Sequence, residues 1–288
     1  MCNCAAYNSD ELYTWCTNCG NYGIHASIKR ALADKNIKPS EVLLCFDIGC
    51  HGNGADKINA YSVHGLHGRI LPFAAGAAIA NKAVTTIAFG GDGGTLSEGI
   101  NHLIHSIRAN YNFTFVLHDN SNYGLTTGQA SATTKQGLEM NSSPSGVTSD
   151  TLIPMELVLS LKPSFAARTF SGNIKHMESI FKQAIEHEGF SYVEVLQSCP
   201  TYNKVTPHEW YAQRVYDVST LEDYDSSDLE LARKVAQDVQ DKIAIGVLYL
   251  NKDKKDYYSR LASRKSIKTE LVEEVKGYNV GNIIDKFR

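Results

Sequence analysis

The run Gly-Gly-Asp-Gly-Gly at 90–94 is the stretch of this sequence best suited to bind a phosphate group. It follows the apolar run 84–89 and precedes a helix expected near 97–109, so its amides would lie at a helix N-terminus, where anions are stabilised. Glycine lets the backbone approach a phosphate closely, but the Asp92 carboxylate would repel that phosphate unless a cation lay between them. The pattern therefore predicts a phosphate-binding turn in which Asp92 is a ligand of Mg²⁺.

Asn120 follows Asp92 by 28 residues, at the end of the next predicted strand. One helix and one strand separate the two residues, as in a right-handed βαβ unit, so both side chains would emerge at the same edge of the sheet. Their oxygen atoms suit Mg²⁺. A plain glycine turn is the alternative. A P-loop would need Gly-Lys-Ser/Thr, and a dinucleotide fingerprint would need glycine in place of Leu96.

The cysteines offer a second possible metal site. Seven are present: Cys2, Cys4, Cys16, Cys19, Cys45, Cys50 and Cys199. Cys16 and Cys19 form a CxxC pair, which alone fits a zinc half-site, a redox pair or chance. No second CxxC follows, as a zinc ribbon would need, whereas Cys50 and Cys199 each follow a predicted strand. Thiolates from scattered loops suit a [4Fe–4S] cluster better than zinc.

These residues need a scaffold, and the sequence predicts alternating strands and helices. Apolar or β-branched runs predict strands at 42–46, 84–89, 113–117, 165–168 and 192–196. Amphipathic segments predict helices near 22–34, 72–82, 97–109, 154–161 and 174–188. This alternation is typical of an α/β fold with a doubly wound, mostly parallel sheet, which binds ligands at the carboxyl ends of its strands.

Two further segments complete the predicted organisation. Residues 120–150 are rich in Gly, Ser, Thr and Asn, and a loop this long inside a compact domain is usually functional. We expect residues 1–220 to form the binding domain. Residues 221–288 would be a C-terminal extension that contacts a partner subunit, with one strand-like run at 243–250.

Composition narrows the classes of function. The chain has 288 residues, 43% of them hydrophobic, so it can bury a sizeable core. Its net charge of −3 provides no basic excess for a phosphate backbone, so no nucleic-acid partner is expected. No leader-like start and no 18-residue apolar window occur, which predicts a cytoplasmic protein with no membrane contact.

Five motifs occur in a fixed order between residues 15 and 203: CxxCG at 16–20, IGCHG at 48–52, HGLHGRILP at 64–72, the GGDGG turn, and DNSNYGLTTGQ at 119–129. Together they resemble the beta subunit of 2-oxoacid:ferredoxin oxidoreductases. Cys45 lies in a predicted strand and outside these motifs, as a small core residue would. Cys2 and Cys4 lie outside the resemblance and are expected to be thiols of a frayed terminus.

The resemblance implies a thiamine-diphosphate-binding fold of the diphosphate type, with roles for individual residues. The cofactor would be bound by Ile48, Gly49, Cys50, His51, His67, Gly93, Gly94, Gly124 and Leu125. Mg²⁺ would be bound by Asp92, Asn120 and the backbone carbonyl of Asn122. One [4Fe–4S] cluster would be bound by Cys16, Cys19, Cys50 and Cys199. His67, flanked by a glycine-rich loop, is the histidine expected to act near the diphosphate.

The family's reaction is the oxidative decarboxylation of a 2-oxo acid. The resemblance implies that it yields acyl-CoA and CO₂, with coenzyme A as co-substrate and electrons passing through the cluster to ferredoxin. An alpha-type subunit should supply the pyrimidine-binding domain and its glutamate. The alternatives are a subunit of a non-oxidative thiamine-dependent decarboxylase or synthase, which needs no cysteines, and a zinc protein that binds other proteins, which leaves the diphosphate site unexplained.

Two departures from the family pattern affect the expected specificity. Gly94 stands where many relatives have an acidic residue, which should alter fine tuning of the metal site. Thr127 stands where some relatives that use 2-oxoglutarate have lysine. A lysine could pair with a second carboxylate, so Thr127 favours a monocarboxylic 2-oxo acid and is predicted to help select the substrate.

Overall fold

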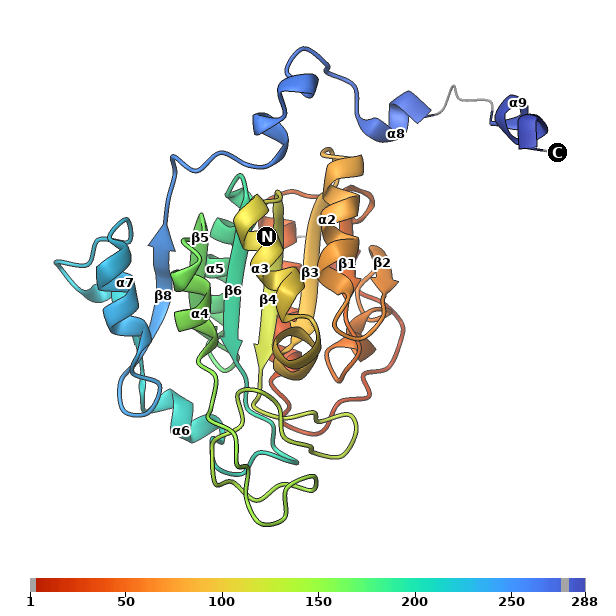
Figure 1. The fold of residues 1–288 in the computed structure, drawn as a ribbon. Helices are drawn as coiled ribbons and strands as arrows, with labels where there is room; N and C mark the ends of the chain where they lie inside the picture. Colours follow the sequence, from red (N-terminus) through yellow and green to blue (C-terminus); the bar gives the residue numbers. More distant parts are fainter. Residues whose placement is uncertain (1–3, 276–279, 288) are drawn as a thin grey trace.

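The computed structural model describes residues 4–275 and 280–287, which form one eight-stranded sheet with helices on both faces (Figure 1). The strands are β1 (Val42–Phe46), β2 (Tyr61–His64), β3 (Thr85–Gly91), β4 (Phe113–Asp119), β5 (Phe165–Phe170), β6 (Phe190–Leu196), β7 (Val215–Asp217) and β8 (Ile243–Leu250). Their order across the sheet is β2-β1-β3-β4-β6-β5-β8-β7. The predicted fold class, a doubly wound and mostly parallel sheet, is confirmed.

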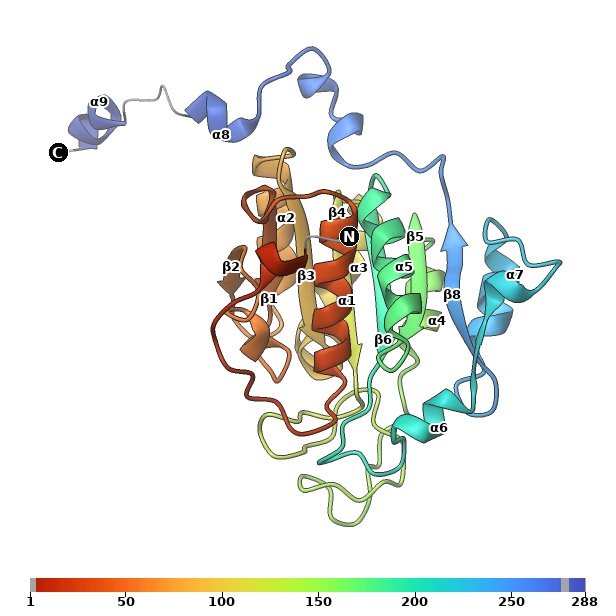
Figure 2. The same cartoon turned by 180° about the vertical axis from the view of Figure 1, so that it is seen from behind.

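The central strands are buried on both faces, which explains their nearly continuous apolar sequences. Every residue of β4, β5 and β6 is buried. Helices α1 (Asn21–Asp34) and α5 (Ile174–Glu186) cover one face (Figure 2). The other face packs against α2 (Ile70–Ala80), α3 (Ile100–Ala109), α4 (Pro154–Ser160) and α7 (Leu229–Ala236). Parallel strands covered in this way need no polar face.

Three short elements, β2, β7 and α6, were not predicted from the sequence. β2 and β7 are edge strands of four and three residues, too short to give a period-2 signal, and α6 (His208–Ala212) has only five residues. The strand-like run 243–250 does form β8, but it pairs antiparallel with β5. The part of the chain that leaves the sheet therefore begins after Leu250 rather than at residue 221.

The helix expected at 97–109 is divided in two. A π-helical segment, Gly93–Glu98, continues from the glycine turn, and α3 begins only at Ile100. Gly99 joins them at a point where the loop before α2 lies very close: a Cβ on Gly99 would be 2.3 Å from the carbonyl oxygen of Gly68. The helix is interrupted at this contact between residues 31 positions apart, and π-helical turns often occur at functional sites.

The two ends of the chain differ in how they are held. Near the N-terminus, Cys4–Tyr7 forms a 3-10 helix, and the buried Tyr7 hydroxyl donates to the Ile37 carbonyl at 2.5 Å. Cys4 is disulfide-bonded, so the expectation of a free thiol is wrong for Cys4. The 3-10 helix and the buried Tyr7 show that this end is not frayed. Cys2 lies outside the described residues.

The C-terminal segment first crosses the amino ends of the strands and then extends away from the body (Figure 1). Asn110 fastens the first part: its side-chain amide donates to the Lys254 carbonyl at 3.1 Å, and its carbonyl accepts from the Tyr257 amide at 2.9 Å. Among the described residues no helix is long and apolar enough to cross a membrane.

Candidate functional site

A cavity opens at the carboxyl ends of β1, β3 and β4. Four loops line it, with Ile48, Gly49, Cys50, His51, His67, Gly91, Asp92, Gly93, Gly94, Asn120, Asn122, Tyr123, Gly124, Leu125 and Thr126. The structure thus brings together every residue expected to bind the cofactor, along with the three expected to bind Mg²⁺. Thr127 lies outside this lining, exposed on the adjoining loop with a left-handed φ of 76°.

The glycines of this cavity are places where the chain leaves no space for a side chain. A Cβ on Gly93 would lie 2.5 Å from the Tyr123 ring, and one on Gly94 would lie 2.5 Å from Oδ2 of Asp47. The Asp47 carboxylate also accepts the Gly68 amide at 2.8 Å, so it joins the turn to the loop that carries His67. The turn is therefore held rigidly, with its backbone rather than side chains facing the cavity.

Asp92 is almost completely buried and is held by hydroxyl groups from the long loop. The Ser131 hydroxyl donates to its Oδ2 at 2.5 Å, the Thr133 hydroxyl lies 2.8 Å from the same oxygen, and the Asn120 backbone amide also donates to the carboxylate. Burial raises the pKa of Asp92 to about 6, and these hydrogen bonds oppose the rise. A buried carboxylate with a raised pKa gains from a nearby cation, as a metal ligand would.

The loop after β4 turns sharply at Ser121, whose φ is 58°, and this turn places Asn120 and Asn122 side by side. The Asn122 amide donates to Asn120 Oδ1 at 3.3 Å, and its side-chain amide donates to the Asn120 carbonyl at 2.8 Å. Asn203 donates to that same carbonyl at 3.1 Å. Side-chain and backbone oxygens of this turn consequently have fixed positions next to Asp92.

Two histidines line the cavity, and their surroundings differ. His51 is buried, its Nε2 has no hydrogen-bond partner within the described chain, and burial holds the pKa of its ring well below the usual range. It is therefore a neutral group with an unsatisfied nitrogen. His67 Nδ1 lies 2.8 Å from Glu98 Oε2, and its ring stacks on Tyr123 with centroids 5.9 Å apart.

The four cysteines expected to bind a cluster gather beside this cavity. Both Cys50 Sγ and Cys199 Sγ lie within 4.0 Å of the point that a Cβ on Gly124 would occupy. Burial is the main cause that raises the pKa of Cys50 to about 12, and the charges of the other three cysteines raise it further. Cys16 is exposed and the other three are partly buried. Cys45 is fully buried in the core, as predicted.

The spacing of these sulfurs bears on which metal they could bind. Among the described residues, no three His, Cys, Asp or Glu side chains are arranged to hold one metal ion. A single zinc ion needs its ligands about 2.3 Å from the metal and hence close to one another. The cysteines are neighbours, yet they are not arranged around one ion.

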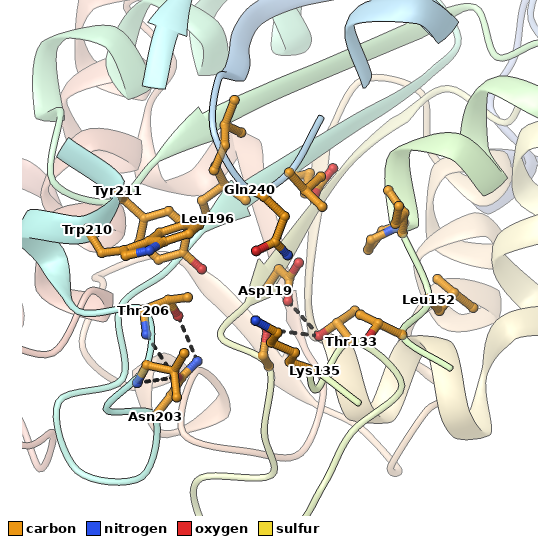
Figure 3. A pocket seen from close by; sticks show the side chains of 18 of the residues that line it. Asp119, Thr133, Lys135, Leu152, Leu196, Asn203, Thr206, Trp210, Tyr211 and Gln240 are labelled. Atoms are coloured by element: carbon orange, nitrogen blue, oxygen red, sulfur yellow. Dashed lines mark hydrogen bonds between the residues drawn. The ribbon is translucent and has the colours of Figure 1, made fainter. Parts of the chain in front are cut away.

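A second cavity, of about 390 Å³, lies beside the first and is lined in part by α6 and by Ile243, the first residue of β8. Figure 3 shows side chains of its lining. Asp119 and Glu194 form its acidic end, and the aromatic rings of Trp210 and Tyr211 form part of its wall. The Thr133 hydroxyl lies between the cavities, 2.8 Å from Asp119 Oδ1 as well as from Asp92. Burial, followed by the charges of Asp92 and Glu194, raises the pKa of Asp119 well above its usual range.

The residues that support Asp92 were not predicted from the sequence. Ser131 and Thr133 lie 39 and 41 residues beyond it, in a loop without a regular period. The only available signal was the density of hydroxyl residues in a long loop. The role of Tyr123 was also not predicted, although Tyr123 lies within the motif at 119–129.

Comparison with known proteins agrees with this geometry. Residues 47–195 match the family described as thiamine pyrophosphate enzyme, C-terminal TPP binding domain, and residues 199–266 match the C-terminal family of the pyruvate ferredoxin oxidoreductase beta subunit. The 2-oxoacid:ferredoxin oxidoreductase subunit beta of Saccharolobus solfataricus is 35% identical over 265 residues, which cover 88% of this chain and 87% of the relative. This chain belongs to the beta subunits of 2-oxoacid:ferredoxin oxidoreductases.

Further relatives support the same family assignment. Subunit beta of 2-oxoacid:ferredoxin oxidoreductase 1 from Aeropyrum pernix is 36% identical over 269 residues, covering 90% of this chain and 85% of the relative. A solved 2-oxoglutarate:ferredoxin oxidoreductase from Magnetococcus marinus, with 2-oxoglutarate, coenzyme A and succinyl-CoA bound, matches with a TM-score of 0.88 and 32% identity. That match covers 99% of this chain and 96% of the other. The beta subunit is thus part of a thiamine-diphosphate-dependent oxidoreductase.

Proposed function

We propose that this beta subunit binds thiamine diphosphate, Mg²⁺ and one [4Fe–4S] cluster, and that its complex with an alpha subunit converts a 2-oxo acid and coenzyme A to acyl-CoA and CO₂. Ferredoxin is the proposed electron acceptor. The observation that carries the proposal is the cavity at the ends of β1, β3 and β4, where a glycine turn, Asp92 and Asn120 meet beside four cysteines. The two alternatives each leave one feature unexplained. A non-oxidative enzyme does not account for the four cysteines, and a zinc protein does not account for the glycine turn with Asp92 and Asn120.

The cavity residues fit a magnesium diphosphate. Asp92, Asn120 and the Asn122 carbonyl offer the hard oxygen ligands that Mg²⁺ prefers, and Asp92 is a buried carboxylate with a raised pKa, which a cation would stabilise. Gly93 and Gly94 leave backbone rather than side chains at the place where phosphates would bind. His51 offers a buried nitrogen without a partner in the described chain.

The cofactor supplies the chemistry, and this chain supplies binding and exclusion of water. Thiamine diphosphate, when bound, provides a carbon nucleophile and an electron sink for breaking the bond to the carboxylate of the substrate. His67 is proposed to act near the diphosphate, where Glu98 and the Tyr123 ring hold its imidazole in place. Neutral His51 is an uncharged wall of the same cavity.

The cysteine group supports a cluster better than a zinc ion. A cubane takes four thiolate ligands, and Cys16, Cys19 and Cys199 come from other segments of the chain yet lie near enough to Cys50 for their charges to raise its pKa. Cys50 lines the cofactor cavity, so a cluster on it would be adjacent to the site where electrons are released.

The choice of substrate is proposed to involve the loop of Thr127. Thr127 is exposed beside the cavity, and Leu125 and Thr126 of the same loop line it. A neutral residue there offers no cation for a second carboxylate, which favours a monocarboxylic 2-oxo acid. A catalytic efficiency for 2-oxoglutarate far above those for pyruvate and 2-oxoisovalerate would contradict this preference.

An alpha subunit is proposed to cover the mouth of the cavity. Leu125, which lines the cavity, is 47% exposed, and Leu66, next to His67 in the chain, is 78% exposed. A partner there would bury them and supply the glutamate that acts on the aminopyrimidine. The segment after Leu250 is proposed as a second contact: Val280, Ile283 and Phe287 are exposed, and a four-residue helix such as α9 (Gly281–Ile284) is not stable alone.

Metal analysis of the anaerobically purified complex tests the proposal directly. A single cubane predicts about four irons per beta chain with visible absorption. Cys199→Ala should lower the iron content, whereas Cys45→Ala, which changes a core cysteine, should leave it largely intact. Stoichiometric zinc without iron would favour the zinc alternative, and bound thiamine diphosphate without iron would favour a non-oxidative enzyme.

The magnesium ligands have their own test. Asp92→Ala removes the charged ligand, so the affinity for thiamine diphosphate in the presence of Mg²⁺ should fall steeply while the fold survives. Isothermal titration calorimetry measures this affinity. Binding as tight as that of the wild type would show that the ligand assignment is wrong.

A further inference from the structure

We infer that Gln197 sets the reduction potential of the cluster by donating a hydrogen bond to the sulfur of Cys19. The inference rests on the proposed cluster and adds a residue that binds neither iron nor cofactor. Gln197 is the residue directly after β6, is 1% exposed, and its backbone amide donates to the Asp119 carbonyl at 2.8 Å. Its position is therefore fixed by the sheet.

The side chain of Gln197 makes three contacts. Its Nε2 lies 3.8 Å from Cys19 Sγ, within the longer range of hydrogen bonds to sulfur, and 3.1 Å from Asn21 Oδ1. Its Oε1 lies 3.2 Å from Nδ1 of His118. The two protons of one amide nitrogen are thus used by one oxygen and one sulfur.

The acceptor character of a thiolate sets the orientation of the amide. A thiolate of Cys19 cannot donate, so the NH₂ group of Gln197 is the end that suits it, 3.8 Å away. In that orientation Oε1 of Gln197 lies 3.2 Å from Nδ1 of His118, which also lies 3.0 Å from Asn21 Oδ1, so Nδ1 is assigned the proton.

The chain is packed closely enough to keep this arrangement. A Cβ on Gly20 would lie 2.5 Å from Cγ of Gln197, so only glycine allows the segment of Cys19 to approach β6. The Gly20 amide donates to the Ser198 carbonyl at 3.4 Å. Cys19 also receives the backbone amide of Asn21, in the first turn of α1.

The electrostatic consequence has a definite sign. Reduction of a cluster adds one negative charge, part of which resides on the thiolate sulfurs, and a hydrogen bond to such a sulfur strengthens as the charge grows. Donors near the sulfurs consequently favour the reduced state and raise the potential. Gln197 is thus a residue that tunes electron transfer without touching substrate.

Gln197→Met tests the inference in the alpha–beta complex, because methionine keeps the length of the side chain and loses the donor. Potentiometric titration followed by electron paramagnetic resonance should give a more negative potential. A tenfold loss in the equilibrium constant for reduction corresponds to about 59 mV for a one-electron couple. Gln183→Met is the matched control, since Gln183 lies on the exposed surface of α5 and its amide faces Ser179.

A second variant keeps the test decisive if methionine disturbs the fold. Gln197→Leu removes the donor without adding a charge, so its potential should also fall. An unchanged or more positive potential in a variant with full iron content would overturn the role of Gln197 alone. Absence of iron from the wild-type complex would instead overturn the proposed cluster.

Discussion

Thr133 connects two buried carboxylates through a single hydroxyl group. Its Oγ1 lies 2.8 Å from Asp92 Oδ2 and 2.8 Å from Asp119 Oδ1, yet a hydroxyl has one proton to donate. Asp92 has a second donor in Ser131. The position of the proposed magnesium ligand is thus determined by residues that do not themselves reach the cavity.

Removing that hydroxyl should weaken metal and cofactor binding. Thr133→Val keeps the size of the side chain, and loss of a supporting hydrogen bond on a ligand typically lowers metal affinity by about 10 to 100-fold. Calorimetric titration of Mg²⁺ and thiamine diphosphate into the purified complex measures the change. Thr220→Val, at an exposed threonine far along the chain, should bind as the wild type does. Equal affinities for both variants would show that Thr133 does not support Asp92.

A second expectation concerns a histidine inside α1. His25 packs among Trp15, Tyr13 and Phe46, and both of its ring nitrogens are buried without partners in the described chain. Burial is the main cause that lowers the pKa of His25 to about 3. The His25 ring is therefore protonated near pH 6.5 in the unfolded chain but stays neutral in the folded chain. The free energy of unfolding consequently falls as the pH falls from 6.5 toward 3.

The contribution of His25 can be isolated by substitution. Within this window one such group lowers the free energy of unfolding by about 1.4 kcal/mol per pH unit. Urea unfolding of wild type and His25→Leu at about pH 6.5 and 4.5 should differ in pH dependence by roughly 2 kcal/mol, with the variant less sensitive. Any packing cost of leucine is the same at both pH values. Identical slopes would mean that His25 is charged in the folded chain.

Among the elements, the division between the π-helical segment and α3 shows how one close contact shapes the site. Gly99 approaches the carbonyl of Gly68 in the loop that carries His67. In α2, by contrast, a Cβ on Gly76 would meet nothing within 4 Å. Gly99 therefore permits a close contact between two segments, whereas Gly76 lies in a helix with space around it.

Alanine at these two glycines should have opposite effects on stability. Gly99→Ala forces backbone apart and should destabilise the chain by about 1–3 kcal/mol, and cofactor affinity should fall because the His67 loop moves. Gly76→Ala should stabilise it by about 0.5–1 kcal/mol, since alanine is the better helix former. Chemical unfolding of both variants measures the difference. Destabilisation of equal size at both positions would contradict the proposed contact.

At the scale of the whole molecule, the proposed cofactor cavity has the exposed side chain of Leu125 in its lining, and Leu66 beside His67 is also exposed. The beta subunit should therefore be inactive alone. Without the glutamate of an alpha subunit, the proton-transfer contribution to the rate, about 10² to 10⁴-fold, would be missing. The assay is 2-oxo-acid-dependent reduction of a viologen dye, with and without the co-expressed partner. Full turnover by the isolated beta chain would require a glutamate within it.

The C-terminal segment supplies a separate prediction about assembly. Deletion of residues 280–287 removes the exposed Val280, Ile283 and Phe287 but leaves the cavity unchanged. The alpha–beta complex should then dissociate more readily, while the deleted chain keeps its affinity for Mg²⁺. Analytical ultracentrifugation over a concentration series measures the association. An unchanged dissociation constant would show that this segment contacts nothing in the complex.

The sequence alone predicts the central strands and the residues at their carboxyl ends, because the patterns that indicate them are local. The buried strands are continuous apolar runs, and Asn120 follows Asp92 by 28 positions across one helical region and one strand, which places both at the same sheet edge. The motifs that include Cys16, Cys50 and Gly124 likewise identify the residues that the fold gathers around one cavity. Short periods and fixed spacings are visible in a single sequence.

Only the tertiary structure decided features that depend on contacts between distant segments. β8 lies antiparallel beside β5 because of pairing between segments far apart in the chain, and no period within 243–250 encodes that neighbour. Ser131 and Thr133 reach Asp92 from a loop without regular structure, and the helix break at Gly99 depends on the carbonyl of Gly68. The packing of one segment against another is a property of the folded chain, so none of these contacts has a local signature.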